Sequence, residues 1–460
     1  MQTHTFIELV TPSFDKPLFI EAFYGHEQLS YGINYTITIV TCIRYDELTT
    51  LIGTTVQFKL QTLHYERYFS GIAIRLQERQ SMPPYYRFQL TLASSIELLK
   101  HHTDFRIFKN TTIQVIIHQL LEQHGFANHR FESDAYRQSI VYRTQYNESS
   151  YDFIRRLLGE YDLIFYVTQT EKQHTIVFSD KRTVANQLMK TLTLSELAIA
   201  DYQLWRFINN SCYSSYPNLT LPLKINDDKI ILSIKHQALN QSHLGHAQAN
   251  HSAISYFQYL TLCDATTLPI LKITAPTIAG IQTAVVSSKQ INVQPLWDYR
   301  HTYTHPLNVS TTATNHTPTY NFKPEIGNET LIQCHQQHVD RPYINGYRYT
   351  QSNRSPFLYG PTAPNEGWYA ASGHHIKLTP DNLTVTSPQN LSLWASQSIQ
   401  LTAVNTLNMQ SNTDITLKAS NKLIIKSNES ITLGTATNGI TISAKEITIN
   451  GLRVQFNKNI

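Results

Sequence analysis

The segment DNLTVTSP QNLSLWAS QSIQLTAV NTLNMQSN TDITLKAS NKLIIKSN, residues 381–428, repeats every eight residues. Each octad carries apolar side chains at its third and fifth positions, and the pattern continues to residue 449 with slightly irregular spacing. Alternate residues of a β-strand point to one face, so these two positions share a face. The residues expected on this apolar face are Leu383, Val385, Leu391, Leu393, Ile399, Leu401, Leu407, Met409, Ile415, Leu417, Leu423, Ile425, Ile431, Leu433, Ile440, Ile442, Ile447 and Ile449.

Each octad therefore predicts a short strand and a corner, stacked at a fixed period. Eight residues are too few to enclose a core, but three intertwined chains can do so, because each supplies one side per level. Full burial stabilises each apolar side chain by about 1.5–3 kcal/mol, so the pattern predicts a needle that is stable only as a trimer. An amyloid-like or edge-rich β segment is the alternative, but the strict repeat favours the needle. The glycines near its end mark the expected tip: Gly434, Gly439 and Gly451.

The composition restricts the classes of protein. The chain has 460 residues, which predicts several domains, and its formal net charge of +4 argues against a dedicated nucleic-acid or polybasic membrane surface. Its four cysteines are scattered without CxxC spacing, so we expect reduced thiols and no zinc site. The N-terminus lacks the features of a signal peptide, and no stretch approaches the roughly 20 apolar residues of a membrane span. We therefore expect cytosolic synthesis and no stable membrane insertion.

The rest of the chain reads as strands with a few helices. Alternating segments in residues 1–100 predict a small antiparallel barrel. A helix is expected after Asn110 or Thr111 as the N-cap, ending near Gly125. A second helix is expected after Ser149 or Ser150, followed by two strands.

Two parts of the chain resemble a known family. IFKNTTIQVIIHQLLEQHGF (107–126) and YRTQYNESSYDFIRRLLGEYDLIFYV (142–167) are similar to the VgrG family, the spike proteins of type VI secretion, whose relatives are the hub and spike of contractile phage tails. This chain has Asp162 at a position where the family pattern usually has Gly. The matching residues are Gln145, Tyr146, Glu148, Ser149, Phe153, Ile154, Arg156, Leu157, Leu158 and Glu160.

A second match resembles the family's oligonucleotide/oligosaccharide-binding-type (OB-like) barrel. PTIAGIQTAVVSS (276–288) resembles its start and KPEIGNETLIQCHQQHVDRPYINGYRY (323–349) its end, although the usual Gly-Asp turn is absent near Gln336 and Gln337. The short segment between them indicates a trimmed barrel. The matching residues are Pro324, Ile326, Gly327, Glu329, Asp340, Arg341, Pro342, Ile344 and Gly346.

The resemblance implies a mainly β fold with four parts: a phage-hub-like region of two β-barrels and helical elements (1–270), an OB-like barrel (271–350), a connector (351–380) and the octad-repeat triple-stranded β-helix (381–460). It implies a homotrimeric puncturing spike that docks on a hexameric Hcp-type tube and baseplate components. It further implies a PAAR-type tip protein, effectors or adaptors as cargo, and export through the injection apparatus.

No catalytic, cofactor-binding or metal-binding residues are predicted. GxSxG, HExxH, P-loop and GxGxxG motifs are absent, and the 347–376 gap is too short for a phage-type lysozyme. We expect no enzyme after the needle either, since the chain ends soon after it. Arg156 and Glu160 fit an i,i+4 helix pair rather than an acid–base set. The turn Asp340–Arg341–Pro342 is interpreted as structural, with Arg341 able to brace a neighbouring chain.

Three alternatives remain open. The spike could belong to a contractile phage tail or an extracellular injection particle, or the chain could be a carbohydrate-binding β fibre, given its 27 tyrosines. An enzyme could also hide in the histidine-rich middle, where four histidines could form a metal cluster. We interpret these as chance clustering and His236 as structural; the four are His236, His243, His246 and His251.

Overall fold

The computed structural model describes residues 6–11, 16, 18–61, 66–171, 173–187, 211–214, 219–222, 224–225, 229–240, 254–264, 268, 273–288, 291–300, 305–310, 325–348, 366–370, 372–435, 438–451 and 453. The chain divides into two compact units, Met1–Pro356 and Phe357–Ile460. Strands dominate both units, which confirms the mainly β prediction. No helix in the described residues is long and apolar enough to cross a membrane.

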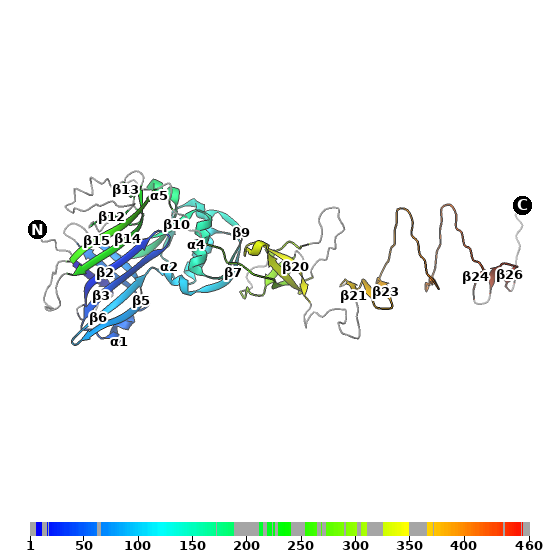
Figure 1. Ribbon diagram of the computed structural model, residues 1–460, viewed down its shortest axis with the longest axis horizontal. Helices are drawn as coiled ribbons and strands as arrows, with labels where there is room; N and C mark the ends of the chain where they lie inside the picture. Colours follow the sequence, from blue (N-terminus) through cyan, green and yellow to red (C-terminus); the bar gives the residue numbers. More distant parts are fainter. Residues whose placement is uncertain are drawn as a thin grey trace. The chain divides into compact units, whose positions relative to one another are not determined.

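The first unit is built on one antiparallel ten-stranded sheet, whose strands lie side by side in Figure 1. Its alternating sequences bury one residue in two, as in β3, where Tyr35, Ile37 and Ile39 are fully buried. In spatial order the strands are β1 (Phe6–Thr11), β4 (Thr55–Gln61), β5 (Glu66–Met82), β6 (Tyr85–Ala93), β3 (Gly32–Thr41), β2 (Leu18–Gln28), β14 (Lys229–Asn240), β15 (Ile254–Asp264) and β12 (Ser211–Ser214), with β13 (Lys224–Ile225) beside β14.

The strands of the first hundred residues do not stand alone as the sequence suggested. β2 pairs with β3 along one edge and with β14 along the other, so strands from residues 6–93 and 211–264 share one sheet. The division of residues 1–270 into two barrels remains a prediction. Short helical turns connect the strands: α1 (Tyr45–Leu48), η1 (Thr49–Leu51), α2 (Ser95–Leu98), η2 (Leu99–His101), η3 (Asp134–Arg137) and α5 (Lys181–Gln187).

Two amphipathic helices pack over a second core. α3 (Ile113–Glu122) and α4 (Ser150–Glu160) bury their apolar faces with the three-stranded sheet β10 (Leu163–Gln169), β11 (His174–Asp180) and β8 (His129–Phe131). The Ser149 hydroxyl caps α4 by accepting from the Asp152 N–H at 3.0 Å, as the sequence predicts. The N-cap of α3 is Thr112 rather than Asn110 or Thr111, because its hydroxyl lies 3.3 Å from the Val115 N–H.

A two-stranded ribbon and a small sheet complete the first unit. The ribbon pairs β7 (Thr103–Thr112) with β9 (Ser139–Ser149), and β9 leads directly into α4. The sheet covers part of the predicted 271–350 barrel, whose residues 301–304 and 311–324 lie outside the described residues. Its order is β18 (His305–Pro306), β17 (Asn292–Pro295), β16 (Gln282–Val286), β19 (Glu329–Cys334) and β20 (Pro342–Arg348), with the turn η5 (His335–Gln337) between β19 and β20.

The second unit contains two three-stranded antiparallel sheets joined by the octads. The sheets are β21 (Glu366–Tyr369), β22 (His375–Leu378) and β23 (Leu383–Thr386), then β24 (Ser430–Gly434), β25 (Gly439–Ser443) and β26 (Ile447–Asn450). Between β23 and β24 the chain has no paired strand, and Figure 1 draws no arrow there. Bends recur every eight residues at 388–389, 396–397, 404–405, 412–413, 420–421 and 428–429, where the sequence predicts corners.

The octads between β23 and β24 have no paired strands among the described residues. The predicted apolar face of the octads is exposed, by 39% to 68% for every residue except Ile431, which is half-buried. The last three repeats depart from the expected pattern, because β24, β25 and β26 pair with one another and set Ile431 opposite Ile442 and Leu433 opposite Ile440. The burial of the needle core therefore remains a prediction that needs further chains.

Candidate functional site

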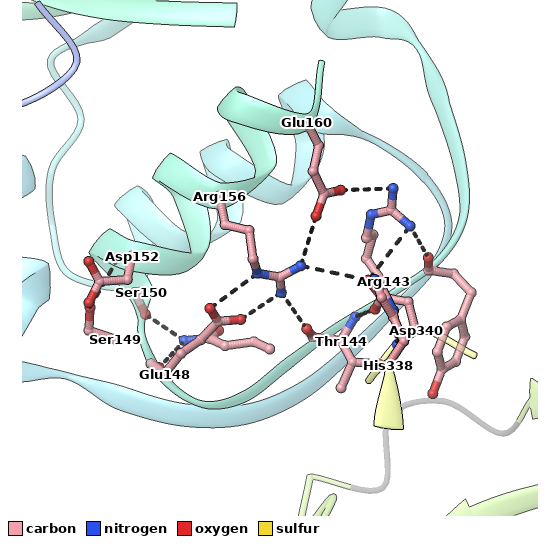
Figure 2. A network of polar contacts seen from close by, with 12 residues as sticks. Arg143, Thr144, Glu148, Ser149, Ser150, Asp152, Arg156, Glu160, His338 and Asp340 are labelled. Carbon is pink, nitrogen blue, oxygen red and sulfur yellow. Dashed lines mark hydrogen bonds and ion pairs between the residues drawn. The ribbon is translucent and has the colours of Figure 1, made fainter. Parts of the chain in front are cut away.

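The two family-like motifs meet at one buried polar cluster. Figure 2 shows Glu148 from β9, Arg156 and Glu160 from α4, and Asp340 from the turn before β20 around the same point. Ser149 ends β9 and caps α4, so the chain reverses between Glu148 and Arg156 and brings the two side chains together. Residues almost two hundred positions apart in sequence therefore share one site.

Arg156 is the centre of this cluster, with a side chain only 1% exposed. Its Nε and Nη2 donate to the two carboxylate oxygens of Glu148 at 3.2 and 2.6 Å, and Nη2 also donates to the Thr144 carbonyl at 2.8 Å. Its Nη1 donates to Glu160 at 3.1 Å and lies 3.6 Å from Asp340 Oδ2. A guanidinium has five donors in a rigid fork, which suits it to hold several acceptors at once.

Asp340 ties this cluster to the five-stranded sheet. Its Oδ1 accepts from the Thr144 backbone N–H at 2.7 Å, and its Oδ2 lies 3.7 Å from Arg143 Nη1. Arg143 in turn lies 3.0 Å from Glu160, which closes a ring of two guanidinium groups and two carboxylates, with Glu148 bound to Arg156 outside that ring. Asp340 lies two residues before β20, so the cluster connects α4 and β9 to that sheet.

The ionisation of the cluster reflects its burial. Desolvation raises the pKa of Glu148 and of Asp340, although the neighbouring arginines oppose that shift. For Arg156, desolvation works against the charge, but hydrogen bonds and attraction from Glu148 outweigh it and raise the pKa. Glu148 and Glu160 already accept hydrogen bonds from Arg156, and Asp340 accepts one from the Thr144 backbone N–H, so this arrangement suits a rigid joint rather than proton transfer.

Two interpretations from the sequence concern this cluster. Arg156 and Glu160 form the expected i,i+4 pair, and Arg156 is in addition buried and bound to Glu148. In the Asp340–Arg341–Pro342 turn, Asp340 makes the contacts to the cluster while Arg341 is exposed, and the bracing of a neighbouring chain by Arg341 remains a prediction.

The other motif residues hold the backbone around the joint. Tyr146 packs edge-on against Phe105 and Trp297, with ring centres 5.2 Å apart in each pair. Phe153 stacks on Phe108 inside the helical core, and Pro342 pairs with Cys334 at the start of β20. Two glycines belong to the five-stranded sheet and its turns. Gly327 precedes β19 and has a φ of 88°, and Gly346 in β20 lies beside Leu331.

The sequence departs from the family pattern at residues with left-handed backbone conformations. Gln336 and Gln337 in η5 have φ values of 52° and 61°, which are conformations that favour glycine. Asp162, in the position where the family usually has Gly, also has a positive φ of 56°. Each of these residues therefore adopts a conformation that glycine would adopt at a lower cost.

Sequence reasoning missed a second buried cluster inside the ten-stranded sheet. Glu27 Oε1 accepts from Arg67 Nη2 at 2.5 Å and from Tyr35 OH at 2.8 Å, and lies 3.0 Å from His236 Nε2. Burial opposes the charge of Glu27, but Arg67 and His236 outweigh it and hold its pKa at about 2. The signal was present in the sequence: Glu27 continues the buried alternation of Phe23 and Gly25 in β2.

The structural role expected for His236 fits this position. His236 is buried, its Nδ1 lies 2.9 Å from Tyr256 OH, and desolvation lowers its pKa to about 4. His243, His246 and His251 lie outside the described residues. Within the described residues no three His, Cys, Asp or Glu side chains gather as a metal site.

The hub portion of the chain matches proteins of known families. Residues 26–203 match the phage tail baseplate hub (GPD) family. Over 160 residues the chain is 30% identical to the type VI secretion system spike protein VgrG1c of Pseudomonas aeruginosa, and over 183 residues 28% identical to VgrG1a of that organism. The predicted resemblance to VgrG spike proteins is confirmed. These matches cover 34% and 39% of this chain but only 22% and 28% of the longer relatives.

A third VgrG relative is named for an activity. The actin cross-linking toxin VgrG1 of Vibrio cholerae is 24% identical over 193 residues, which are 40% of this chain and 18% of the toxin. Because so little of the toxin is matched, its activity does not transfer to this chain by similarity.

Solved structures extend the likeness of fold beyond the matched sequence. The Escherichia coli c3393 protein, a type VI secretion component described as similar to T4 phage tail proteins gp27 and gp5, superposes with a TM-score of 0.56 at 18% identity. That match covers 74% of this chain and 99% of c3393. The half-lidded Francisella PdpA–VgrG complex gives a TM-score of 0.54 at 11% identity over 97% of this chain and 87% of that one.

Proposed function

We propose that this protein is a homotrimeric spike and hub of a type VI secretion system. The observation that carries the proposal is the apolar face of the octads, which is exposed in a single chain over residues 383–449. Monomeric proteins rarely expose a contiguous apolar surface of this extent. Three copies would bury it, each supplying one side of a closed prism.

A closed prism suits a device that transmits force. It has no free strand edges, and its levels repeat without a flexible linker between them. The bends at each octad junction provide the corners that such a prism needs. Serine hydroxyls support some corners: those of Ser411 and Ser427 accept from the backbone N–H groups of Thr413 and Glu429.

The hub would join the spike to the rest of the machine. Its similarity to phage tail hubs and VgrG spikes supports docking on a hexameric Hcp-type tube and on baseplate components. The needle end would carry a PAAR-type tip protein, and effectors or adaptors would ride on the needle or tip. The spike would assemble in the cytoplasm and leave the cell through the apparatus.

A contractile phage tail or an extracellular injection particle is a second candidate, favoured by the match to the phage baseplate hub family. The trimeric spike and its mechanics would be the same, and only the tube partner would differ. In either setting we propose a structural rather than catalytic role, with the Arg156 cluster as a rigid joint.

The mass of the purified protein in solution tests the proposal. Light scattering of the full chain should give three chains of 52.8 kDa each, in a complex that resists heat and detergent. A variant that ends at Thr379 keeps the first unit but loses the octads, so it should trimerise weakly or not at all. A stable full-length monomer would contradict the spike.

A further inference from the structure

Two histidines outside the joint face each other between α3 and β8. His118 lies on α3, and His129 begins β8 after a turn that contains Gly125. The Nδ1 atom of His118 and the Nε2 atom of His129 are 2.9 Å apart. The His118 side chain is 48% exposed, so solutes can reach the pair from solvent.

Their other ring nitrogens have partners that can only accept. His118 Nε2 lies 3.1 Å from Glu122 Oε1, one helical turn further along α3, and His129 Nδ1 lies 3.1 Å from the Phe126 carbonyl oxygen. A carboxylate and a carbonyl provide no proton, so His118 Nε2 and His129 Nδ1 must carry the ring hydrogens.

The facing nitrogens of two neutral rings then both present lone pairs. At 2.9 Å these lone pairs repel unless something positive lies between them. A proton shared by the rings would satisfy them, and so would a metal ion. Holding each ligand histidine through its second nitrogen by a carboxylate or carbonyl is the usual arrangement around protein-bound transition metals.

We propose that His118 and His129 form a surface site for a divalent transition metal ion such as Zn²⁺. Imidazole nitrogens suit zinc, copper and nickel. Two nitrogens each 2.0–2.1 Å from a tetrahedral zinc ion are about 3.3 Å apart, so the rings need to separate by only about 0.4 Å. Water or a group from a partner would fill the remaining positions, since no third candidate ligand gathers here among the described residues.

The bound ion would tie the middle of α3 to the start of β8. α3 is already fixed on its other face by buried Ile116, Ile117 and Leu120, and β8 by its parallel pairing with β11. The site is thus preorganised by elements that pack independently of the metal. The Glu122 carboxylate adds a negative charge that favours a cation.

Calorimetric titration of ZnCl₂ into the full-length protein tests the site. The chain has 20 histidines, so the decisive quantity is the difference between variants rather than the total heat. His118→Gln and His129→Gln should each lose one zinc ion per chain relative to the wild type. Glu122→Gln should keep the site with affinity about 10–100-fold weaker.

His101→Gln is the matched control, because His101 is an exposed histidine on η2 that belongs to no such pair. It should bind as many zinc ions as the wild type. His118 is exposed on a helix surface, so His118→Gln should melt like the wild type without metal and decides the question even if His129→Gln misfolds. An unchanged number of sites in His118→Gln would overturn the proposal and leave a shared proton between the rings.

Discussion

At the scale of single residues, the Glu27 cluster places charge inside an apolar core. His236, Arg67 and Tyr35 surround Glu27 among the buried rings of Phe23 and Phe69. Gly25 makes this packing possible: a Cβ on it would lie 2.7 Å from the Phe23 ring and 3.0 Å from the His236 ring. The arrangement is stable only while each buried polar group keeps its partner.

The protonation of His236 should make the protein sensitive to mild acid. Burial keeps its folded-state pKa at about 4, below the ordinary histidine value of 6.5, so the unfolded chain gains this proton first as the pH falls. The free energy of unfolding should therefore fall between pH 6.5 and 4, by about 2 kcal/mol from pH 7 to pH 5. Glu27 adds a loss only below its unfolded pKa, because its folded value is about 2.

Urea unfolding at pH 7 and pH 5, followed by circular dichroism, measures this loss. His236→Gln keeps an amide able to donate to Glu27 but does not titrate, so its stability should change less between the two pH values. An equal loss in the variant and the wild type would show that other groups govern the acid sensitivity.

At the scale of elements, α4, β9 and the turn before β20 depend on one another through Arg156. The sequence predicted α4, its Ser149 cap and its apolar face, because each of these features can be recognised from a few neighbouring residues. The contact between Arg156 and Asp340 could not be predicted from the sequence. The periodicity of apolar residues shows which face of a helix is buried, but not which distant residues pack against that face. The Thr112 cap shows the related limit that helix ends shift by a residue or two.

Arg156→Met should destabilise the first unit by about 3–5 kcal/mol, because it leaves Glu148 buried without its positive partner and Asp340 with Arg143 alone. Asp340→Asn should cost less than about 1 kcal/mol, since an amide oxygen can still accept from the Thr144 N–H and burial already disfavours the carboxylate charge. Urea unfolding of both variants provides the comparison. Equal stabilities would mean that Arg156 does not organise the cluster.

The turn between α4 and β10 offers a test at Asp162, whose φ of 56° is unfavourable for most side chains. Asp162→Gly should leave stability unchanged or raise it by up to about 1 kcal/mol, whereas Asp162→Val should lower it by about 1–2 kcal/mol because branched side chains resist this conformation. Thermal melting separates the two. A valine variant as stable as the wild type would show that the turn can rearrange.

At the scale of the whole molecule, a single chain leaves the apolar face of its octads exposed to solvent. The sequence indicated both the repeat and the need for three chains, and the bends fall at the junctions between octads. Among the described residues of this unit, the strands are those for which the chain supplies its own partner, as in β22–β23 and β24–β25. Between them the backbone has strand-like sequence without paired strands, and in the proposed trimer the partners would belong to other copies.

Charge placed on the apolar face should therefore prevent trimerisation. In Leu401→Asp/Leu417→Asp each trimer would bury six carboxylates without partners, and the cost of desolvating them far exceeds the stabilisation from the remaining levels nearby. Gln400→Asp/Thr416→Asp adds the same charges at neighbouring positions that alternate to the opposite face. Sedimentation equilibrium should show monomers for the first variant and trimers for the second. Trimers in both would mean that the octad face is not the trimer core, and monomers in both would mean that added charge alone separates the chains.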